Sequence, residues 1–165
     1  MGSKVLHKEA SLRQIHHYMK KKVITITKKE NLLHAAKKMA KHRIGCLVVE
    51  HHDVPVGIIT EGDYLKKVVI EETEPHTHLV EEVMTKTIRS LPEDADLVSA
   101  YKLMQKYRID HFPVINKSGK LVGLITEKEL LRGMSDIIHH LDWKLVRTKI
   151  AFSDFEKHLE DVDVI

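Results

Sequence analysis

The chain has 165 residues, a formal net charge of +3, 42% hydrophobic residues and 31% charged residues. This composition is typical of a globular protein with one well-buried domain or two small fused units. So small a net charge gives no strong field for nucleic acid, and no apolar run approaches the roughly 18 residues that a membrane helix needs. Cys46 is the single cysteine and excludes an internal disulfide. We therefore expect a cytoplasmic protein without nucleic-acid or membrane partners.

The first half of the chain predicts a strand, a helix, two strands and a second helix. A polar lead-in precedes a short strand over residues 23–26. Thr27 and Glu30 have the spacing of a capping box, which predicts that a helix with a regular apolar face begins there. Two apolar runs over residues 44–50 and 56–60 predict strands, and a helix is expected over residues 61–72.

The second half repeats this order. The stretch GIITEGD at residues 57–63 returns as GLITEKE at residues 123–129, an offset of 66 positions. Strands are expected at residues 87–91, 112–115 and 121–126, and the last helix near Glu127. The predicted organisation is a lead-in, a first repeat, a linker, a second repeat and a tail, with bounds 1–14, 15–73, 74–78, 79–136 and 137–165.

The tail has no counterpart in the first repeat. Its apolar residues Ile137, Ile138, Leu141 and Leu145 have helical spacing, and the last dozen residues are acidic. A helix that is partly apolar needs a covering surface, either the core or a second chain. We therefore predict a homodimer whose contact includes the repeat helices, with the tail covering or extending it.

The order and spacing of these pieces resemble the cystathionine-β-synthase (CBS) domain pair, also called a Bateman module. The matching pieces in the first repeat are Met19 followed by VITIT, RIGCLVVE and GIITEGD. In the second they are Met84 followed by TIRSLPEDADL, RIDHFPVI and GLITEKE. The resemblance implies an α/β fold in which tandem repeats, each β-α-β-β-α, pack as a pseudo-twofold pair with two clefts, followed by a helical tail. Such clefts often bind AMP, ADP, ATP or S-adenosylmethionine.

In that family the acidic residue of the repeated motif hydrogen-bonds the ribose of the ligand. The resemblance assigns this role to Asp63, with Thr60 beside it, and places Thr87 and Ile88 against adenine. A carboxylate suits the role because it accepts from two vicinal hydroxyls. The alternative interpretation is structural, because Thr60 and Asp63 also have the spacing of a helix cap. Both roles are compatible if the cap uses only one carboxylate oxygen.

The resemblance also places Arg108 and His111 near the phosphates in this cleft. Asp110 departs from the family pattern, since its charge would repel phosphate. A solvated charge at a helix end is the alternative role for Arg108.

In the second cleft Glu129 stands where the second aspartate is expected. Its side chain is one methylene longer, so a ribose placed for aspartate would have to shift. We therefore expect this cleft to be empty or weaker. The other matching positions are Val23, Ile24, Arg43 and Thr126.

The other chemistry-bearing residues have simpler interpretations. Eight of the 13 histidines occur as adjacent pairs or in the linker, and none has zinc-site spacing, so we expect solvated histidines and no metal. Cys46 lies in an apolar strand and is expected to be an inert core thiol. Lys20, Lys21 and Lys22 are interpreted as a solvated run.

Three hypotheses for the function follow. The first is a non-catalytic regulatory module that senses AMP, ADP, ATP or S-adenosylmethionine and acts on an unknown effector protein. The second is a ligand-free dimerisation module, which Asp110 and Glu129 favour. The third, an enzyme or metal protein that uses the histidine-rich surface, has no nucleophile–base pair or phosphate-binding loop to support it.

Overall fold

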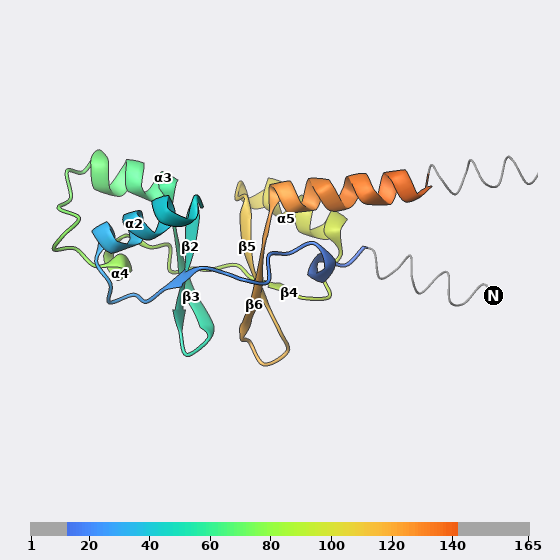
Figure 1. Cartoon of the computed structure of the whole chain (residues 1–165), viewed down its shortest axis with the longest axis horizontal. Coiled ribbons are helices and arrows are strands. Elements are labelled where there is room, and N and C mark those ends of the chain that lie inside the picture. Colours follow the sequence, from blue (N-terminus) through green and yellow to red (C-terminus); the bar gives the residue numbers. More distant parts are fainter. Residues whose placement is uncertain (1–12, 142–165) are drawn as a thin grey trace, which may run out of the picture.

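The computed structural model describes residues 13–141, and these residues form two three-stranded sheets of the same design (Figure 1). The first sheet contains β1 (Thr25–Ile26), β2 (Cys46–His51) and β3 (Val54–Thr60). The second contains β4 (Leu91–Pro92), β5 (His111–Ile115) and β6 (Leu121–Thr126). In each sheet the first pair of strands is parallel and the second antiparallel. The predicted α/β tandem repeat is therefore confirmed.

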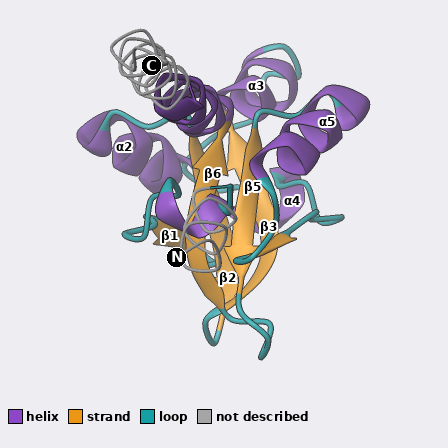
Figure 2. Cartoon of the chain, turned by 90° about the vertical axis from the view of Figure 1, so that its right-hand side faces the viewer, coloured by secondary structure: helices purple, strands orange, loops and turns teal. Residues whose placement is uncertain are grey.

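The helices lie around the two sheets (Figures 1 and 2). They are the short 3-10 turn η1 (Ile15–His17), α2 (Leu32–His42), α3 (Glu61–Asp63) with its π-helical continuation η2 (Tyr64–Val69), α4 (Val80–Val83), α5 (Leu97–Tyr107) and a long helix over residues 127–141. The β2–β3 and β5–β6 turns extend away from the helices, at the opposite end of the molecule (Figure 1).

Several predicted boundaries are wrong for identifiable reasons. Helix α2 begins five residues after Thr27, because the side chain of Asn31 caps it by accepting the N–H of His34 at 2.8 Å. Glu30 makes only half of the expected capping box, accepting the Thr27 N–H at 3.0 Å. Strands β1 and β4 are shorter than predicted, and regular α-helix ends at Asp63. Residues 1–12 and 142–165, including Leu145, lie outside the described part.

The two repeats exchange their first segments. Ile15, Tyr18 and Met19 pack into the core of the second sheet, whereas Val83 and Met84 pack into the core of the first. The backbone crosses as well. Lys20 pairs with Leu124 through hydrogen bonds of 2.8 and 3.0 Å, and Thr85 pairs with Ile58 through hydrogen bonds of 2.9 and 3.1 Å. These crossings account for the short β1 and β4, because the residues before them pair with the other repeat.

A third core cluster lies between the sheets. Buried Cys46, Val48 and Leu124 form it, with half-buried side chains from both repeats packed around them. Apolar burial thus joins the sheets along their facing strands. Within residues 13–141 the structure contains no helix with the length and apolar character needed to cross a membrane.

The exchange requires a glycine on each receiving strand. A Cβ at Gly123 would lie 2.3 Å from the sulfur of Met19, and a Cβ at Gly57 would lie 2.6 Å from the sulfur of Met84. We predict that Gly123→Ala or Gly57→Ala lowers the free energy of unfolding by about 1–3 kcal/mol, as overpacking does in other cores. Denaturant titration measures this loss.

Two comparisons separate the methionine contact from a general effect of alanine. Gly62→Ala is the control, because its nearest contact would be an ordinary 3.5 Å from the Thr60 hydroxyl. In a double-mutant cycle, Met19→Ala should remove most of the cost of Gly123→Ala, because the clash partner is gone. An equal cost of Gly123→Ala in both backgrounds contradicts the proposed contact.

Candidate functional site

One cavity brings together all six residues predicted for the first cleft. It has a volume of about 380 Å³ and lies where the N-terminal end of α3 meets the segment before β4 and the start of β5. We call it the Asp63 cavity. The predicted residues in its lining are Thr60, Asp63, Thr87, Ile88, Arg108 and His111. The volume is within the range of small-molecule sites, about 300–1,000 Å³.

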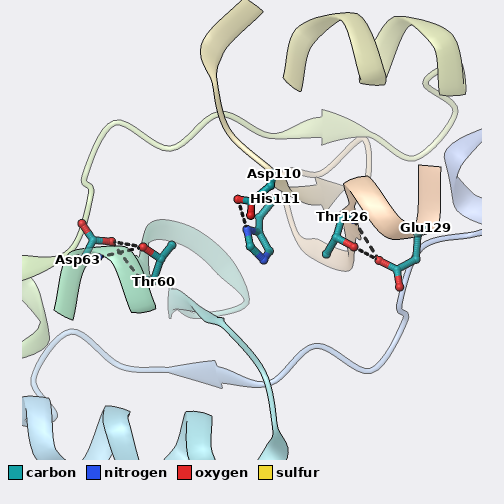
Figure 3. Close-up of polar contacts among 6 residues, drawn as sticks. All are labelled: Thr60, Asp63, Asp110, His111, Thr126 and Glu129. Atoms are coloured by element: carbon teal, nitrogen blue, oxygen red, sulfur yellow. Dashed lines mark hydrogen bonds and ion pairs between the residues drawn. The ribbon is translucent and has the colours of Figure 1, made fainter. Parts of the chain in front are cut away.

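Asp63 forms a reciprocal cap with Thr60 at the start of α3 (Figure 3). Its Oδ2 accepts the Thr60 N–H at 2.9 Å and the Thr60 hydroxyl at 2.8 Å, and its own N–H donates to that hydroxyl at 3.2 Å. The other oxygen, Oδ1, lies 3.0 Å from the ammonium of Lys67. The predicted cap therefore exists, but Oδ1 faces a cation instead of being free. A carboxylate oxygen has two acceptor positions, so Oδ1 retains capacity for a ligand hydroxyl.

The lining of the Asp63 cavity also contains residues that were not predicted from the sequence. Among them are Lys66, Arg89 and Tyr107. The guanidinium of Arg89 lies 3.7 Å from the centroid of the Tyr107 ring, a cation–π contact that holds it in the cavity wall. Weak signals were available, because Arg89 directly follows Ile88, and Lys66 lies one helical turn after Asp63.

A second cavity of about 340 Å³ lies at the start of the helix over residues 127–141. We call it the Arg43 cavity. Of the five residues predicted for the second cleft, Val23, Ile24, Arg43 and Thr126 line it, and Glu129 does not. Its lining also includes Lys20, Lys22 and Lys128. Two of the lysines interpreted as a solvated run thus belong to a cavity wall.

Glu129 is held by Thr126 and Lys20, two residues that line the Arg43 cavity. Its Oε2 accepts the Thr126 N–H at 3.3 Å and also the Thr126 hydroxyl, and its Oε1 lies 3.4 Å from the ammonium of Lys20 (Figure 3 shows the Thr126 pair). Burial raises the pKa of Glu129, but the hydrogen bonds from Thr126 and the charge of Lys20 outweigh it, and the net pKa lies below the usual value of 4.5. Glu129 is therefore a buried, charged cap.

The two cavities share Asp110 and His111. The ring nitrogen Nδ1 of His111 lies 2.6 Å from Oδ1 of Asp110, and Figure 3 shows this pair between the two caps. Asp110, the residue that departs from the family pattern, thus has a partner. Its charge is partly compensated when His111 is protonated.

The other candidates from the sequence were Cys46 as a nucleophile and the histidines as metal ligands. Burial, followed by the charge of Asp110, raises the pKa of the Cys46 thiol to about 12, so at neutral pH it is not a thiolate nucleophile. Among the described residues, no three His, Cys, Asp or Glu side chains form a group that could hold a metal ion.

The charge of Glu129 leads to a prediction about how the stability of the fold depends on pH. Its folded-state pKa lies below 4.5, so its ionised form stabilises the fold above that pH, and the contribution is lost as the pH falls through the folded pKa. Wild type should therefore melt higher than Glu129→Gln at neutral pH, and the difference should shrink in acid. Glu93→Gln, at an exposed site, is the control. A difference in melting temperature that does not change with pH contradicts the assignment.

Comparison with known proteins points to one family. A family model described as the CBS domain matches residues 12–70 and 80–136. An uncharacterised protein of Methanopyrus kandleri is 35% identical over 111 residues, which are 67% of this chain and 57% of that protein. The chain thus spans little more than half the length of this relative.

Comparison with solved structures points to the same family. A protein with CBS domains from Burkholderia ambifaria is 36% identical, with a TM-score of 0.65 over 69% of this chain and 83% of that one. The CBS domain pair of the protein MJ0100, in complex with 5-methylthioadenosine and S-adenosyl-L-methionine, is 27% identical, with a TM-score of 0.67 over 74% of this chain and 96% of that one. The chain therefore belongs to the CBS domain family and carries a tandem pair of these domains.

Proposed function

We propose that this chain is a non-catalytic regulatory module that senses an adenosyl nucleotide in the Asp63 cavity. The observation that carries the proposal is that one cavity combines a capped carboxylate, an apolar wall and basic side chains, of which Lys66 and Arg108 form no ion pair within residues 13–141. These are the three chemical features needed for a ribose, a base and a phosphate group. The complex of MJ0100 with two adenosyl ligands supports this class of ligand.

The ribose is assigned to Asp63. The cap with Thr60 fixes the orientation of the carboxylate, and the side chain is only 13% exposed, so a hydrogen bond to it is formed largely away from water. Lys67 forms an ion pair with the carboxylate and donates a hydrogen bond to the carbonyl of Val83 at 2.6 Å. An ionised acceptor with a fixed position suits two vicinal hydroxyls.

The base and the phosphates are assigned to different residues of the same cavity. Ile58, Ile88 and Pro113 contribute apolar surface for adenine, with Thr87 beside them. We assign the phosphate group to Arg108 and His111, and the ligand would be AMP, ADP, ATP or S-adenosylmethionine. In this proposal the bound ligand stabilises one arrangement of the two repeats, which an effector protein in the cytoplasm recognises.

Two variants of Asp63 test the site. Asp63→Ala should weaken nucleotide binding by about 1.5–3 kcal/mol, which corresponds to about ten- to a hundredfold in Kd. It should also lose about 1 kcal/mol of stability with the cap. Asp63→Asn keeps an oxygen for Thr60 but removes the charge, so it should lose affinity with little loss of stability. Calorimetric titration with AMP, ATP and S-adenosylmethionine measures the affinities.

Glu129→Gln is the matched control, because Glu129 caps the equivalent helix but does not line the Arg43 cavity. Wild-type affinity of Asp63→Ala, or a loss of ligand only in Glu129→Gln, shows that the cleft has been assigned wrongly. If wild type binds none of the three ligands, the chain is a ligand-free dimerisation module instead.

We also propose a homodimer formed through the repeat helices. Leu65, Val69 and Ile70 on and beside η2 are 58%, 65% and 69% exposed, and Leu131 and Ile138 on the last helix are 52% and 58% exposed. Two equivalent helices that both expose large apolar side chains form a surface that a second copy of the chain would cover.

Charged substitutions on these helices should separate the dimer. Val69→Lys and Ile138→Lys place a charge within the proposed contact, where burial is costly. We expect monomers by light scattering at concentrations where wild type is dimeric. Val54→Lys, on β3 and 42% exposed, is the control and should stay dimeric. A monomeric wild type, or dimeric helix variants, contradicts the assignment.

A further inference from the structure

Two short stretches of backbone cross between the repeats and carry the exchanged methionines. We call them the crossing segments, residues 18–20 and 83–85. Each is held by a basic side chain of the other repeat. Lys67 donates a hydrogen bond to the carbonyl of Val83 at 2.6 Å, and Arg132 donates one to the carbonyl of Tyr18 at 3.3 Å. Both carbonyls lie at the end of a short helix, where the helix itself supplies no partner.

Lys67 makes a second contact with the same ammonium group. This group lies 3.0 Å from Oδ1 of Asp63, the oxygen that takes no part in the cap with Thr60. A line of charge-assisted contacts therefore runs from a carboxylate in the cavity wall, through one ammonium group, to the peptide that joins Val83 to Met84. A movement of the carboxylate changes where the ammonium group can lie, and the carbonyl is affected in turn.

The backbone around Lys67 has an uncommon conformation. Lys67 belongs to the π-helical segment η2, in which the N–H of Ile70 donates to the carbonyl of Leu65 at 3.1 Å. The carbonyl of Lys67 itself accepts the hydroxyl of Thr73 at 2.8 Å, which ties its backbone to the end of the segment. π-helical turns are rare and occur frequently at functional sites. The side chain of Lys67 therefore starts from a defined point beside the cavity.

In the second repeat the two contacts belong to different side chains. Glu129 forms its ion pair with Lys20, whereas Arg132 holds the carbonyl of Tyr18 and forms no ion pair within residues 13–141. The second repeat thus holds its crossing segment without joining carbonyl and carboxylate through one cation. Arg132 is for this reason a matched comparison for Lys67.

We propose that Lys67 is a positioning residue that couples the Asp63 carboxylate to the Val83 carbonyl of the crossing segment. Ligand hydroxyls that bind Oδ1 fix the carboxylate, which fixes the ammonium group and, through it, the peptide. The coupling is reciprocal, because a crossing segment that holds Lys67 also holds the carboxylate in place for a ligand. The effect of a ligand rests on the function proposed for the Asp63 cavity, whereas the coupling between the two protein groups does not.

The coupled peptide supplies its own measurement. The N–H of Met84 shares a peptide group with the Val83 carbonyl and donates to a helix carbonyl at 2.8 Å, so its exchange with solvent reports how firmly the peptide is held. The N–H of Met19 shares a peptide group with the Tyr18 carbonyl, donates at 2.9 Å, and is the reference. Comparing the two amides removes the general stabilisation that any ligand gives to the folded state.

The first experiment needs no ligand. It compares amide hydrogen exchange by NMR in wild type, Asp63→Asn, Lys67→Met and the double variant, after a melting curve has verified that each is folded. Asp63→Asn should speed exchange at Met84 relative to Met19 by about two- to threefold, the size expected for a partly exposed ion pair. In the Lys67→Met background it should have no such effect. An unchanged rate in Asp63→Asn, or an equal acceleration in both backgrounds, overturns the proposal.

The second experiment adds AMP, ATP and S-adenosylmethionine in turn. A ligand that binds should slow exchange at Met84 by about two- to threefold more than at Met19 in wild type. This difference should disappear in Lys67→Met and return in Lys67→Arg, which restores a cation with several donors. Arg132→Met should speed exchange at Met19 and leave the effect of the ligand on Met84 unchanged.

The outcomes separate this proposal from the proposed function. A ligand effect on Met84 that persists in Lys67→Met overturns the coupling, even though the ligand binds. If wild type binds none of the three ligands, the proposed function fails, and the exchange rates without ligand decide whether Lys67 couples the two groups.

Discussion

The exchange of first segments between the two repeats is the constraint on which the rest of the structure depends. Met19 packs over Gly123 and Met84 packs over Gly57. The hydrophobic core on each sheet therefore includes a side chain from the other repeat. Neither half has a complete core by itself, and a unit of about 60 residues is already marginal in buried surface. The exchange therefore couples the stability of the halves and holds their sheets against each other.

Both cavities are consequences of that arrangement. Each is bounded by a helix start in one repeat and by the strand and helix-end segments of the other. Asp110 and His111 lie between them and line both. A change in the relative position of the two sheets would alter both cavities together, which is the physical basis on which a ligand could shift the arrangement of a CBS domain pair.

The difference between the cavities comes from a single methylene and its surroundings. Asp63 and Glu129 cap equivalent helices through equivalent threonines. The shorter aspartate stays at the cavity wall with Lys67 beside it, whereas the longer glutamate turns into the structure and meets Lys20. The same local motif therefore places a carboxylate in a cavity wall in one repeat and buries it beside Lys20, outside the cavity lining, in the other.

The sequence by itself determined the repeat and the order of its elements, because these follow from local periodicity and from a motif that occurs twice. Six residues of the Asp63 cavity came from the family resemblance, which did not include Lys66, Arg89 or Tyr107. The sequence did not show that Asn31, and not Thr27, would cap α2, which begins at Leu32. It also did not show that Lys22 and Lys128 would meet at one cavity or that Glu129 would turn away from it. Those features depend on the crossing of the chain between repeats, which brings together residues about a hundred positions apart, and no local pattern records such contacts.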